Sequence, residues 1–299
     1  MSQARRFLLL LNPSAGGGRA REMLPRIEAA MGAAGLAHRA VLTTGLEHGC
    51  AEACAAAIDG EIPVVISGDG LIGQVGGALA GSGATMGLIP GGRGNDLARV
   101  LGIPDDVSAA VAMLMAGDSR AIDVGEVNDH RFLGIASCGF DSDANRIANE
   151  ARLVRGRLVY AYAALRALVG WKQATFTLTL DGERTVYRGY GVAAANSQAY
   201  GGGMYAAPDA ELDDGLLDVV TLSETSKLRF LTGVLPKVFD GSHVKLPEIG
   251  VRRAAEVRVE ADRPFAVYAD GDHIADLPAT VKLLPRALRV IVPAAASTG

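Results

Sequence analysis

Residues 1–125 alternate short apolar runs with segments in which apolar residues recur at helical spacing. This alternation predicts βαβ units and a parallel sheet. The expected strands are 6–12, 38–44, 62–68, 85–91 and 121–127, and the expected helices lie near 19–34, 48–58, 71–81, 95–101 and 107–116. Ligands of such sheets bind at the carboxyl ends of the strands, so the turns that follow the strands are the first candidates for chemistry.

Beyond residue 125 the pattern changes to short strand-like segments joined by tight turns such as Asp181-Gly182 and Asp270-Gly271. These features are typical of antiparallel strands and hairpins. One long helical stretch, roughly 142–170, interrupts them. The second part of the chain is therefore expected to be a β-rich domain with an inserted helix.

Two apolar stretches resemble export or membrane segments at first sight. The first is a run of five residues ended by Asn12 and Pro13, which predicts a buried strand and not a signal peptide. The second, 158–171, is too short to span a bilayer and contains Arg166. No transmembrane segment is expected.

The composition narrows the classes of partner. The 299 residues, 49% hydrophobic and 21% charged, are typical of a globular chain that forms one large domain or two ordinary ones. The net charge of −4 argues against nucleic acid, because binding a phosphate backbone requires a concentrated positive surface. The three cysteines have no metal-binding spacing, so free thiols in a reducing cytoplasm are expected and zinc is not.

Four turns carry candidate chemistry: NPSAGGG (12–18), SGDG (67–70), PGGRGND (90–96) and AIDVG (121–125). The first three are expected at the same edge of the sheet. Glycines there let the backbone approach a phosphate, and helix N-termini supply N–H donors. None matches the Walker lysine loop or the dinucleotide fingerprint, so anion binding and sharp structural corners both remain open for each turn taken alone.

An aspartate lies in or beside each of three of these turns: Asp69, Asp96 and Asp123. Each has an ordinary structural explanation, as a turn former, a helix N-terminal acid or a buried acceptor. Carboxylates near a phosphate become favourable when Mg²⁺, mostly coordinated by water, lies between them. The three together predict a Mg²⁺–nucleotide site.

Longer motifs extend this interpretation to nearly the whole chain. IPGGRGNDLARVLGIP (89–104) and YGGGMYAAPDAELDDGLLDV (200–219) are the most specific, and NPSAGGG, SGDG, DVGEV and ADGD accompany them. In their order along the chain these motifs resemble those of the diacylglycerol kinase catalytic family, which includes bacterial diacylglycerol kinases and sphingosine and ceramide kinases.

The resemblance implies a doubly wound α/β nucleotide-binding domain over 1–125 and a C-terminal β-sandwich domain for the lipid substrate over 126–287. It also implies an active site between them and a tail, about 288–299, that returns to the first domain. The reaction it implies is transfer of the γ-phosphoryl group of ATP to a lipid hydroxyl with Mg²⁺.

The resemblance also suggests roles for single residues. Asp270, in ADGD, resembles the general base that takes the proton of the attacking hydroxyl, and Asp69 is the alternative base. Without the resemblance, Asp270 is simply a hairpin corner. Asp69, Asp96 and Asp123 resemble the carboxylates that organise Mg²⁺ and its waters. The expected nucleotide contacts are Asn12, Pro13, either Thr43 or Thr44, Ser67, Gly68, Asp69, Gly70, Gly92, Arg93, Gly94 and Asn95.

A second metal site is implied by the segment DAELDDGLLDV (209–219). It resembles a structural metal loop in which Asp214 binds through its carboxylate and Glu211 and Leu216 bind through carbonyl oxygens. Such oxygen ligands suit Mg²⁺ or Ca²⁺. The alternative is a solvated acidic loop before a strand.

The chain departs from the family pattern at three informative positions, two in the bacterial motif Gly-Gly-Asp-Gly-Thr followed by Asn-Glu-Val and one in PGGRGND. Leu71 lacks a hydroxyl that would bond the nucleotide or a Mg²⁺-bound water, although sphingosine-kinase-like sequences share it. Gln74 lacks a negative charge. Arg93 stands where a small residue is usual, and it either grips a phosphate or points outward to pair with an acid. These changes keep open the alternative of a nucleotide-binding regulatory protein without turnover. A second alternative is an enzyme like the ATP-dependent NAD kinases, which share the Gly-Gly-Asp-Gly-type turn.

The expected partners are a lipid substrate and a second copy of the chain in a homodimer. A transient membrane contact is a further hypothesis, because 152–171 combines arginines with apolar residues; a core helix with arginines at its edges is the favoured alternative. The expected location is cytoplasmic, peripheral to the inner face of the membrane.

Overall fold

The computed structural model describes residues 5–150 and 158–294. The chain forms two compact units: unit 1 contains Met1–Val124 and Pro285–Gly299, and unit 2 contains Gly125–Leu284. Two strands have residues in both units, β5 (Ser119–Val127) and β17 (Ala279–Ile291).

Unit 1 is built on a parallel sheet in the order β17-β4-β3-β1-β2. The predicted strands are present as β1 (Arg6–Leu11), β2 (Ala37–Leu42), β3 (Glu61–Ser67) and β4 (Thr85–Pro90). Every residue from Phe7 to Leu11 is fully buried, as expected for a strand with neighbours on both sides and helices over both faces. The apolar start of the chain is therefore a core strand.

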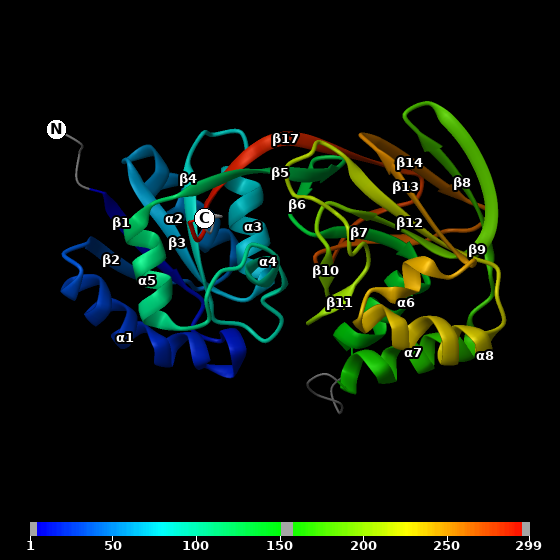
Figure 1. The fold of residues 1–299 in the computed structure, drawn as a ribbon, viewed down its shortest axis with the longest axis horizontal. Coiled ribbons are helices and arrows are strands. Elements are labelled where there is room, and N and C mark those ends of the chain that lie inside the picture. Colours follow the sequence, from blue (N-terminus) through cyan, green and yellow to red (C-terminus); the bar gives the residue numbers. More distant parts are fainter. Residues whose placement is uncertain (1–4, 151–157, 295–299) are drawn as a thin grey trace, which may run out of the picture. The chain divides into compact units, whose positions relative to one another are not determined.

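The helices of unit 1 lie on both faces of this sheet. The chain moves outward from β1 to β2 and then back to β3, and right-handed crossovers therefore place the first helix and the next two on opposite faces. The packing agrees, since α1 contacts α5 and α2 contacts α3 (Figure 1). The elements are η1 (Ala15–Gly17), α1 (Arg19–Ala33), α2 (Leu46–Ile58), α3 (Asp69–Leu79), α4 (Asp96–Val100) and α5 (Val107–Ala116). The doubly wound α/β fold is confirmed.

Unit 2 is an antiparallel β-sandwich, as predicted. The first half of its longest strand, β9, pairs with β8, and the second half pairs with both β7 and β12. The strands are β6 (His130–Phe132), β7 (Ile135–Gly139), β8 (Ala174–Leu180), β9 (Glu183–Ala195), β12 (Leu217–Ser223), β13 (Ile249–Ala254), β14 (Glu256–Ala261), β15 (Ala266–Ala269) and β16 (Asp272–Asp276). A separate small hairpin consists of β10 (Ala199–Tyr200) and β11 (Met204–Tyr205).

The helical part of unit 2 is larger than the sequence indicated. The stretch predicted as one helix forms α6 (Phe140–Glu150) and α7 (Leu158–Gly170), and residues 151–157 lie outside the described ranges. Four further short helical elements were not predicted, because Gly233, Pro236 and Gly241 interrupt their periodicity. They are α8 (Lys227–Arg229), η2 (Phe230–Val234), η3 (Leu235–Phe239) and η4 (Ser242–Lys245).

Aromatic side chains join the helices of unit 2 to its sandwich. The rings of Phe140, Trp171, Tyr190 and Phe230 contact one another with centroids 4.9–6.2 Å apart. Such pairs add stabilisation beyond the area they bury. The aromatic contacts therefore fix α6 and η2 on β9. These three elements also line a cavity that is described below.

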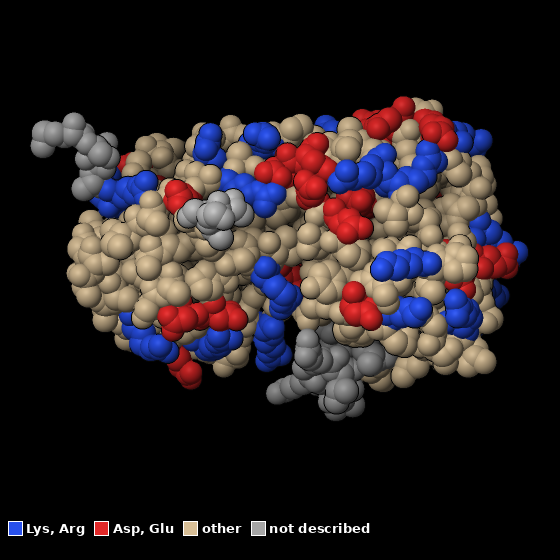
Figure 2. All heavy atoms as spheres, in the orientation of Figure 1, with Lys and Arg blue, Asp and Glu red and all other residues tan. Residues whose placement is uncertain are grey.

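The surface carries charges of both signs. On the face shown in Figure 2, acidic and basic side chains are intermixed, in keeping with the small net charge of −4. Within the described ranges, none of the helices has both the length and the apolar character required to cross a bilayer.

Candidate active site

Three of the predicted loops meet at the carboxyl edge of the unit 1 sheet. A Cβ on Gly92 would lie 2.3 Å from the Cα of Gly68, and a Cβ on Gly16 would lie 2.5 Å from the carbonyl oxygen of Gly91. The Gly91 N–H also donates to the Ser67 carbonyl at 2.9 Å. Only glycine permits these approaches, so the glycines of loops 12–18, 67–70 and 90–96 are required for bringing the loops together.

Asn95 shapes the third loop from within. It has a φ of 54°, in the left-handed region that asparagine tolerates better than most residues. Its Oδ1 accepts from the Gly92 N–H at 2.9 Å, and its Nδ2 donates to the Gly92 carbonyl at 3.3 Å. The side chain predicted as a nucleotide contact is thus engaged in closing the turn that precedes α4.

The predicted metal carboxylates lie in three different settings. Asp69 is the first residue of α3, is half-buried, and its Oδ1 accepts from the Leu97 N–H at 3.3 Å. Asp96 is buried and pairs with Arg99. Asp123 on β5 is fully buried and accepts from the Arg286 N–H at 2.6 Å.

These settings restrict how Mg²⁺ could bind. In the described ranges no group of three or more His, Cys, Asp or Glu residues is arranged to hold a metal ion. Mg²⁺ usually keeps several waters and uses only one or two carboxylates together with substrate phosphates. Asp69 fits that arrangement because it is accessible at the loop cluster. Asp96 and Asp123 instead fit a supporting role, because their carboxylates hold parts of the chain together.

The two threonines after β2 differ in accessibility. Thr43 is buried, and both its N–H and its hydroxyl donate to the Leu11 carbonyl, at 2.8 and 3.3 Å. Thr44 is exposed, and the Nδ1 of His48 lies 3.1 Å from its N–H nitrogen and 3.2 Å from its hydroxyl. Of the pair left open by the sequence, Thr44 is the one that a nucleotide can reach. At the end of the neighbouring strand, Oδ1 of Asn12 accepts from the Ser14 N–H at 3.0 Å.

Two of the residues that depart from the family pattern, Leu71 and Arg93, lie in different surroundings. Leu71 is 2% exposed and packs against Gly49 of α2, where its Cδ1 lies 2.7 Å from the position of a Cβ. Its side chain therefore strengthens the α2–α3 contact. Arg93 is exposed and extends toward the first loop, with Nη2 3.6 Å from the Cβ position of Gly17. Across the described part of the chain no carboxylate forms an ion pair with Arg93.

Asp270 lies in unit 2, at the corner between β15 and β16. It has a φ of 50°, and its carboxylate accepts from three successive backbone amides: Leu133 at 2.8 Å, Gly134 at 3.0 and 3.2 Å, and Ile135 at 3.1 Å. A Cβ on Gly134 would lie only 2.4 Å from Oδ1, so a larger residue there would displace the Asp270 carboxylate. Burial raises the pKa of Asp270, and the three amides oppose this rise. A carboxylate has about four acceptor positions, so three amides leave one for a substrate hydroxyl.

The predicted structural metal loop carries polar contacts of its own. Oδ1 of Asp214 accepts from the Leu216 N–H at 3.0 Å, and Oδ2 pairs with the Arg253 guanidinium. Arg253 also lies 3.6 Å from Oδ2 of Asp218. The metal site expected at Glu211, Asp214 and Leu216 stays a prediction.

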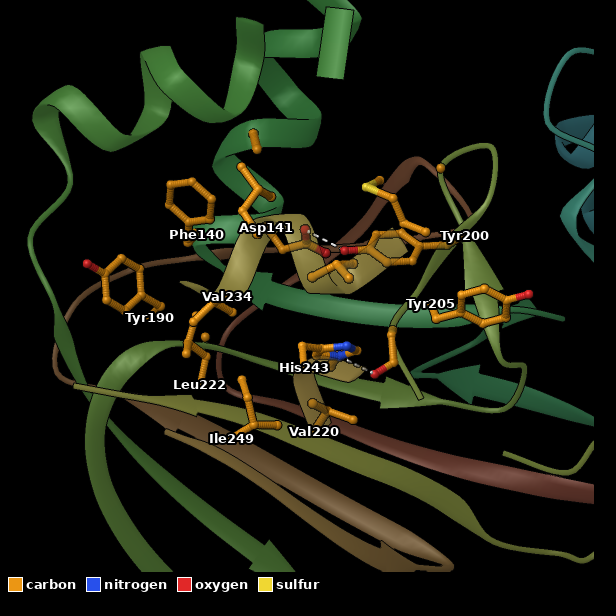
Figure 3. Close-up of a pocket in the computed structure, with 18 of the residues that line it drawn as sticks. Phe140, Asp141, Tyr190, Tyr200, Tyr205, Val220, Leu222, Val234, His243 and Ile249 are labelled. Atoms are coloured by element: carbon orange, nitrogen blue, oxygen red, sulfur yellow. Dashed lines mark hydrogen bonds between the residues drawn. The ribbon is translucent and has the colours of Figure 1, made fainter. Parts of the chain in front are cut away.

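Unit 2 contains a cavity of about 220 Å³ that the sequence did not reveal (Figure 3). Its walls are mostly apolar and come from β7, β9, β12, α6, η2 and η3 and from the β10–β11 hairpin. The residues that form it are spread from Cys138 to Ile249. Because they lie on elements that meet only in the folded chain, no local pattern could have identified them.

The chain is thus a two-part protein with a cluster of glycine loops at the sheet edge of one unit and an apolar cavity in the other. Two family profiles match the chain: "Diacylglycerol kinase catalytic domain" over residues 6–127 and "YegS C-terminal NAD kinase beta sandwich-like domain" over residues 134–292. The chain belongs to the diacylglycerol kinase catalytic family and is a lipid kinase.

Similar proteins support the same assignment. A diacylglycerol kinase of Mycobacterium tuberculosis (strain CDC 1551 / Oshkosh) is 36% identical, covering 95% of this chain and 94% of the relative. A diacylglycerol kinase of Bacillus subtilis (strain 168) is 29% identical, covering 78% of each chain. A crystal structure of a diacylglycerol kinase from Bacillus anthracis str. Sterne has the same fold, with a TM-score of 0.75 and 22% identity over 98% of both chains.

Proposed function

We propose that this protein transfers the γ-phosphoryl group of ATP to the hydroxyl of a diacylglycerol-like or sphingoid-like lipid, with Mg²⁺. The observation that carries the proposal is the meeting of three glycine loops at one edge of the sheet, with accessible Asp69 and Arg93 beside them. Loops with free backbone N–H groups at helix N-termini suit phosphates. Family membership supports the lipid as acceptor, and the diacylglycerol kinases among the relatives favour diacylglycerol as the first lipid to test.

In this proposal unit 1 positions the nucleotide. The backbone of loops 12–18, 67–70 and 90–96 surrounds the phosphates, Thr44 contacts the nucleotide, and Arg93 neutralises phosphate charge. Asp69 would help to hold Mg²⁺, while Asp96 supports loop 90–96 through Arg99 and Asp123 ties β5 to β17. When bound, Mg²⁺ would supply positive charge that offsets the charge developing during transfer.

Asp270 is proposed as the general base. Its remaining acceptor position takes the proton of the lipid hydroxyl as the oxygen attacks the γ-phosphorus, and ADP leaves with the bridging oxygen. A raised pKa brings a carboxylate closer to the pH at which a base works well. The three backbone amides fix the orientation of the Asp270 carboxylate and so hold it in place for the proton transfer.

The apolar cavity of unit 2 is proposed to hold a lipid chain. Apolar pockets with a few polar groups are the usual form of sites for such ligands. Phe239 lines the cavity and is 55% exposed, so it marks where the cavity opens to the surface. Burial of the acyl chain there would leave the head group free to react.

Turnover is tested by incubating the purified protein with labelled ATP and Mg²⁺ and a panel of diacylglycerol, sphingosine, ceramide, undecaprenol-type lipids and NAD. Phosphorylation of a lipid and not of NAD is expected. ATP binding without transfer to any acceptor would favour the regulatory alternative, and transfer to NAD would favour the NAD kinase-like one.

Arg93→Gln is expected to raise the KM for ATP about tenfold or more. A hydrogen bond to a charged group is worth roughly 1.5–3 kcal/mol, and about 1.4 kcal/mol corresponds to a factor of ten. The matched control is Arg21→Gln, which removes another exposed arginine, on α1. Steady-state kinetics with varied ATP would contradict the assignment if both variants kept the KM of the parent protein.

Membrane contact is proposed on the helices that flank the cavity. Tyr162, Leu165 and Val169 are exposed on α7 at the spacing of one helix face, and Val169 is 83% exposed. Nζ of Lys227 donates to the Val169 carbonyl at 2.9 Å, which brings Leu228, 72% exposed, close to this face. The arginine-rich start of the segment predicted from sequence, 152–157, lies outside the described residues.

The charge around this apolar face favours an anionic lipid surface. Residues 158–173 and 224–248 contain six lysines and arginines and three acidic residues, although the whole chain has a net charge of −4. Val169→Asp and Leu228→Asp together are expected to reduce co-sedimentation with anionic vesicles about tenfold. Ile58→Asp, at an 86% exposed apolar position in unit 1, is the control. Equal binding by the control and the double variant at low salt would rule out this surface.

A further inference from the structure

The apolar cavity of unit 2 contains an acidic side chain that the proposed transfer reaction does not use. Asp141, in the first turn of α6, lines the cavity, and its Oδ1 accepts from the Tyr200 hydroxyl at 3.0 Å (Figure 3). The surrounding walls are apolar, with Phe140, Val192 and Leu222 among them. Placing a carboxylate in such walls is unfavourable unless a donor compensates it.

A second polar side chain faces the same space. His243 is 4% exposed and lines the cavity, with Nε2 3.1 Å from the Ala206 carbonyl. Burial lowers the pKa of His243, and the backbone carbonyls of Ala206 and Lys237 oppose this shift. Backbone carbonyls therefore face the imidazole ring, and the acceptor that this cavity presents to a ligand is the Asp141 carboxylate.

Asp141 and the proposed base, Asp270, both contact residues of β7 in unit 2. The Ser137 and Tyr200 hydroxyls both hydrogen-bond the Asp141 carboxylate, so this carboxylate lies beside Ser137 of β7. Ile135, two residues earlier on β7, donates its N–H to Asp270. Two residues of strand span about 7 Å. Asp270 and Asp141 are thus held by nearby positions of the same strand, Asp270 by a backbone amide and Asp141 by a side-chain hydroxyl.

We propose that Asp141, whose carboxylate accepts a hydrogen bond from Tyr200, recognises a second hydrogen-bond donor on the lipid head group, a hydroxyl or an ammonium group beside the hydroxyl that is phosphorylated. This inference rests on the proposed function, and it makes Asp141 a specificity-determining residue. Monoacylglycerol supplies such a hydroxyl, and a sphingoid base supplies a hydroxyl and an ammonium group. The ester oxygen of diacylglycerol at the same place is an acceptor and cannot donate to the carboxylate.

The test compares three lipids of matched chain length: monoacylglycerol, sphingosine and diacylglycerol. For Asp141→Asn, kcat/KM with monoacylglycerol or sphingosine is expected to fall about tenfold or more relative to diacylglycerol, because a charge-assisted hydrogen bond is lost. The KM for ATP should remain unchanged. A larger loss for sphingosine than for monoacylglycerol would identify the ammonium as the preferred donor.

Tyr200→Phe is the second variant, and it leaves the carboxylate in place. It is expected to keep the parent's order of preference among the three lipids. Thermal unfolding of both variants verifies that they fold. Equal ratios among the lipids for Asp141→Asn and the parent protein, or no binding of either donor-bearing lipid by the parent, would overturn the inference.

Displacement of a fluorescent acyl probe separates this inference from the proposed function. If no lipid is phosphorylated, the proposed function fails, yet the binding ratios of the three lipids still decide the role of Asp141. Weaker binding of the donor-bearing lipids by Asp141→Asn, with unchanged binding of diacylglycerol, supports recognition in the cavity. Equal weakening for all three lipids contradicts it.

Discussion

Asp270→Asn is expected to lower phosphoryl transfer about a hundredfold or more, which is the lower end of general acid–base contributions. The amide of asparagine cannot accept the proton of the lipid hydroxyl at the pH where the carboxylate does. ATP affinity should change little, because the proposed nucleotide contacts are in unit 1. Single-turnover measurements with saturating ATP and lipid isolate this step.

The structure adds a stability effect to this variant. Three backbone amides donate to the Asp270 carboxylate, and an asparagine NH₂ group would face at least one of them. Leaving a buried donor unsatisfied costs about 1–3 kcal/mol. The variant is therefore expected to unfold at lower temperature, and activity should be measured well below that temperature.

The chain contains a matched control for this structural loss. Asp181 also occupies an Asp-Gly corner with positive φ, and its carboxylate also accepts backbone amides, from Ala255 and Glu256. Asp181→Asn should lower the unfolding temperature in a similar way and leave kcat unchanged. Comparable loss of transfer in both variants would reduce Asp270 to a structural corner and leave Asp69 as the candidate base.

The pH dependence gives a second readout for the same residue. Burial raises the pKa of Asp270, so its proton is retained to a higher pH than in an ordinary carboxyl group. A base must be deprotonated, and kcat/KM should therefore fall as the pH drops through this raised pKa. In Asp270→Asn that acidic limb should disappear. An unchanged limb in the variant would assign it to another group.

Much of unit 1 could be predicted because its information is local. Strands such as β1 are continuous apolar runs, and the direction of a right-handed crossover fixes which edge carries the loops. The convergence of loops 12–18, 67–70 and 90–96 followed from these two facts, and the glycine contacts confirm it.

The internal bonding of the sites could not be predicted, because it depends on residues distant in sequence. Asp123 is bound by the backbone of Arg286, 163 positions away, and Asp270 is bound by the turn at Leu133, 137 positions away. Asp214 is expected to bind a metal from its local motif, and the fold adds Arg253, from a neighbouring strand, as a partner of its carboxylate. A carboxylate in a motif indicates the need for a positive partner, and the fold decides whether that partner is an ion, an arginine or an amide.

The same reasoning explains Leu71. Judged by sequence, it is the loss of a hydroxyl beside the nucleotide turn. In the folded unit its side chain lies between α3 and α2 and contacts Gly49. Leu71 therefore replaces a polar side chain with core packing next to loop 67–70, and the three glycine loops keep their close approach.

Gly92→Ala is expected to have the largest effect on nucleotide binding. The added Cβ would lie 2.3 Å from the Cα and 2.9 Å from the nitrogen of Gly68, and 3.0 Å from Oδ1 of Asn95. Two of these atoms belong to backbone, so the contact can be relieved only by moving one loop away from the other. Forced overpacking of this kind typically costs about 1–3 kcal/mol.

This strain acts on the separation of loops 67–70 and 90–96, which the proposed triphosphate site requires. If the loops must return to their native separation to bind ATP, the binding reaction bears the strain, and affinity should fall about tenfold to a hundredfold. Isothermal titration with ATP and Mg²⁺ measures this directly. Gly32→Ala is the control, because Gly32 lies in α1 with no atom within 4 Å of the new Cβ, and alanine favours a helix. A folded Gly92→Ala protein that binds ATP as tightly as this control would show that the close approach of the two loops is not needed for the nucleotide, and the proposed phosphate site would then have to lie elsewhere.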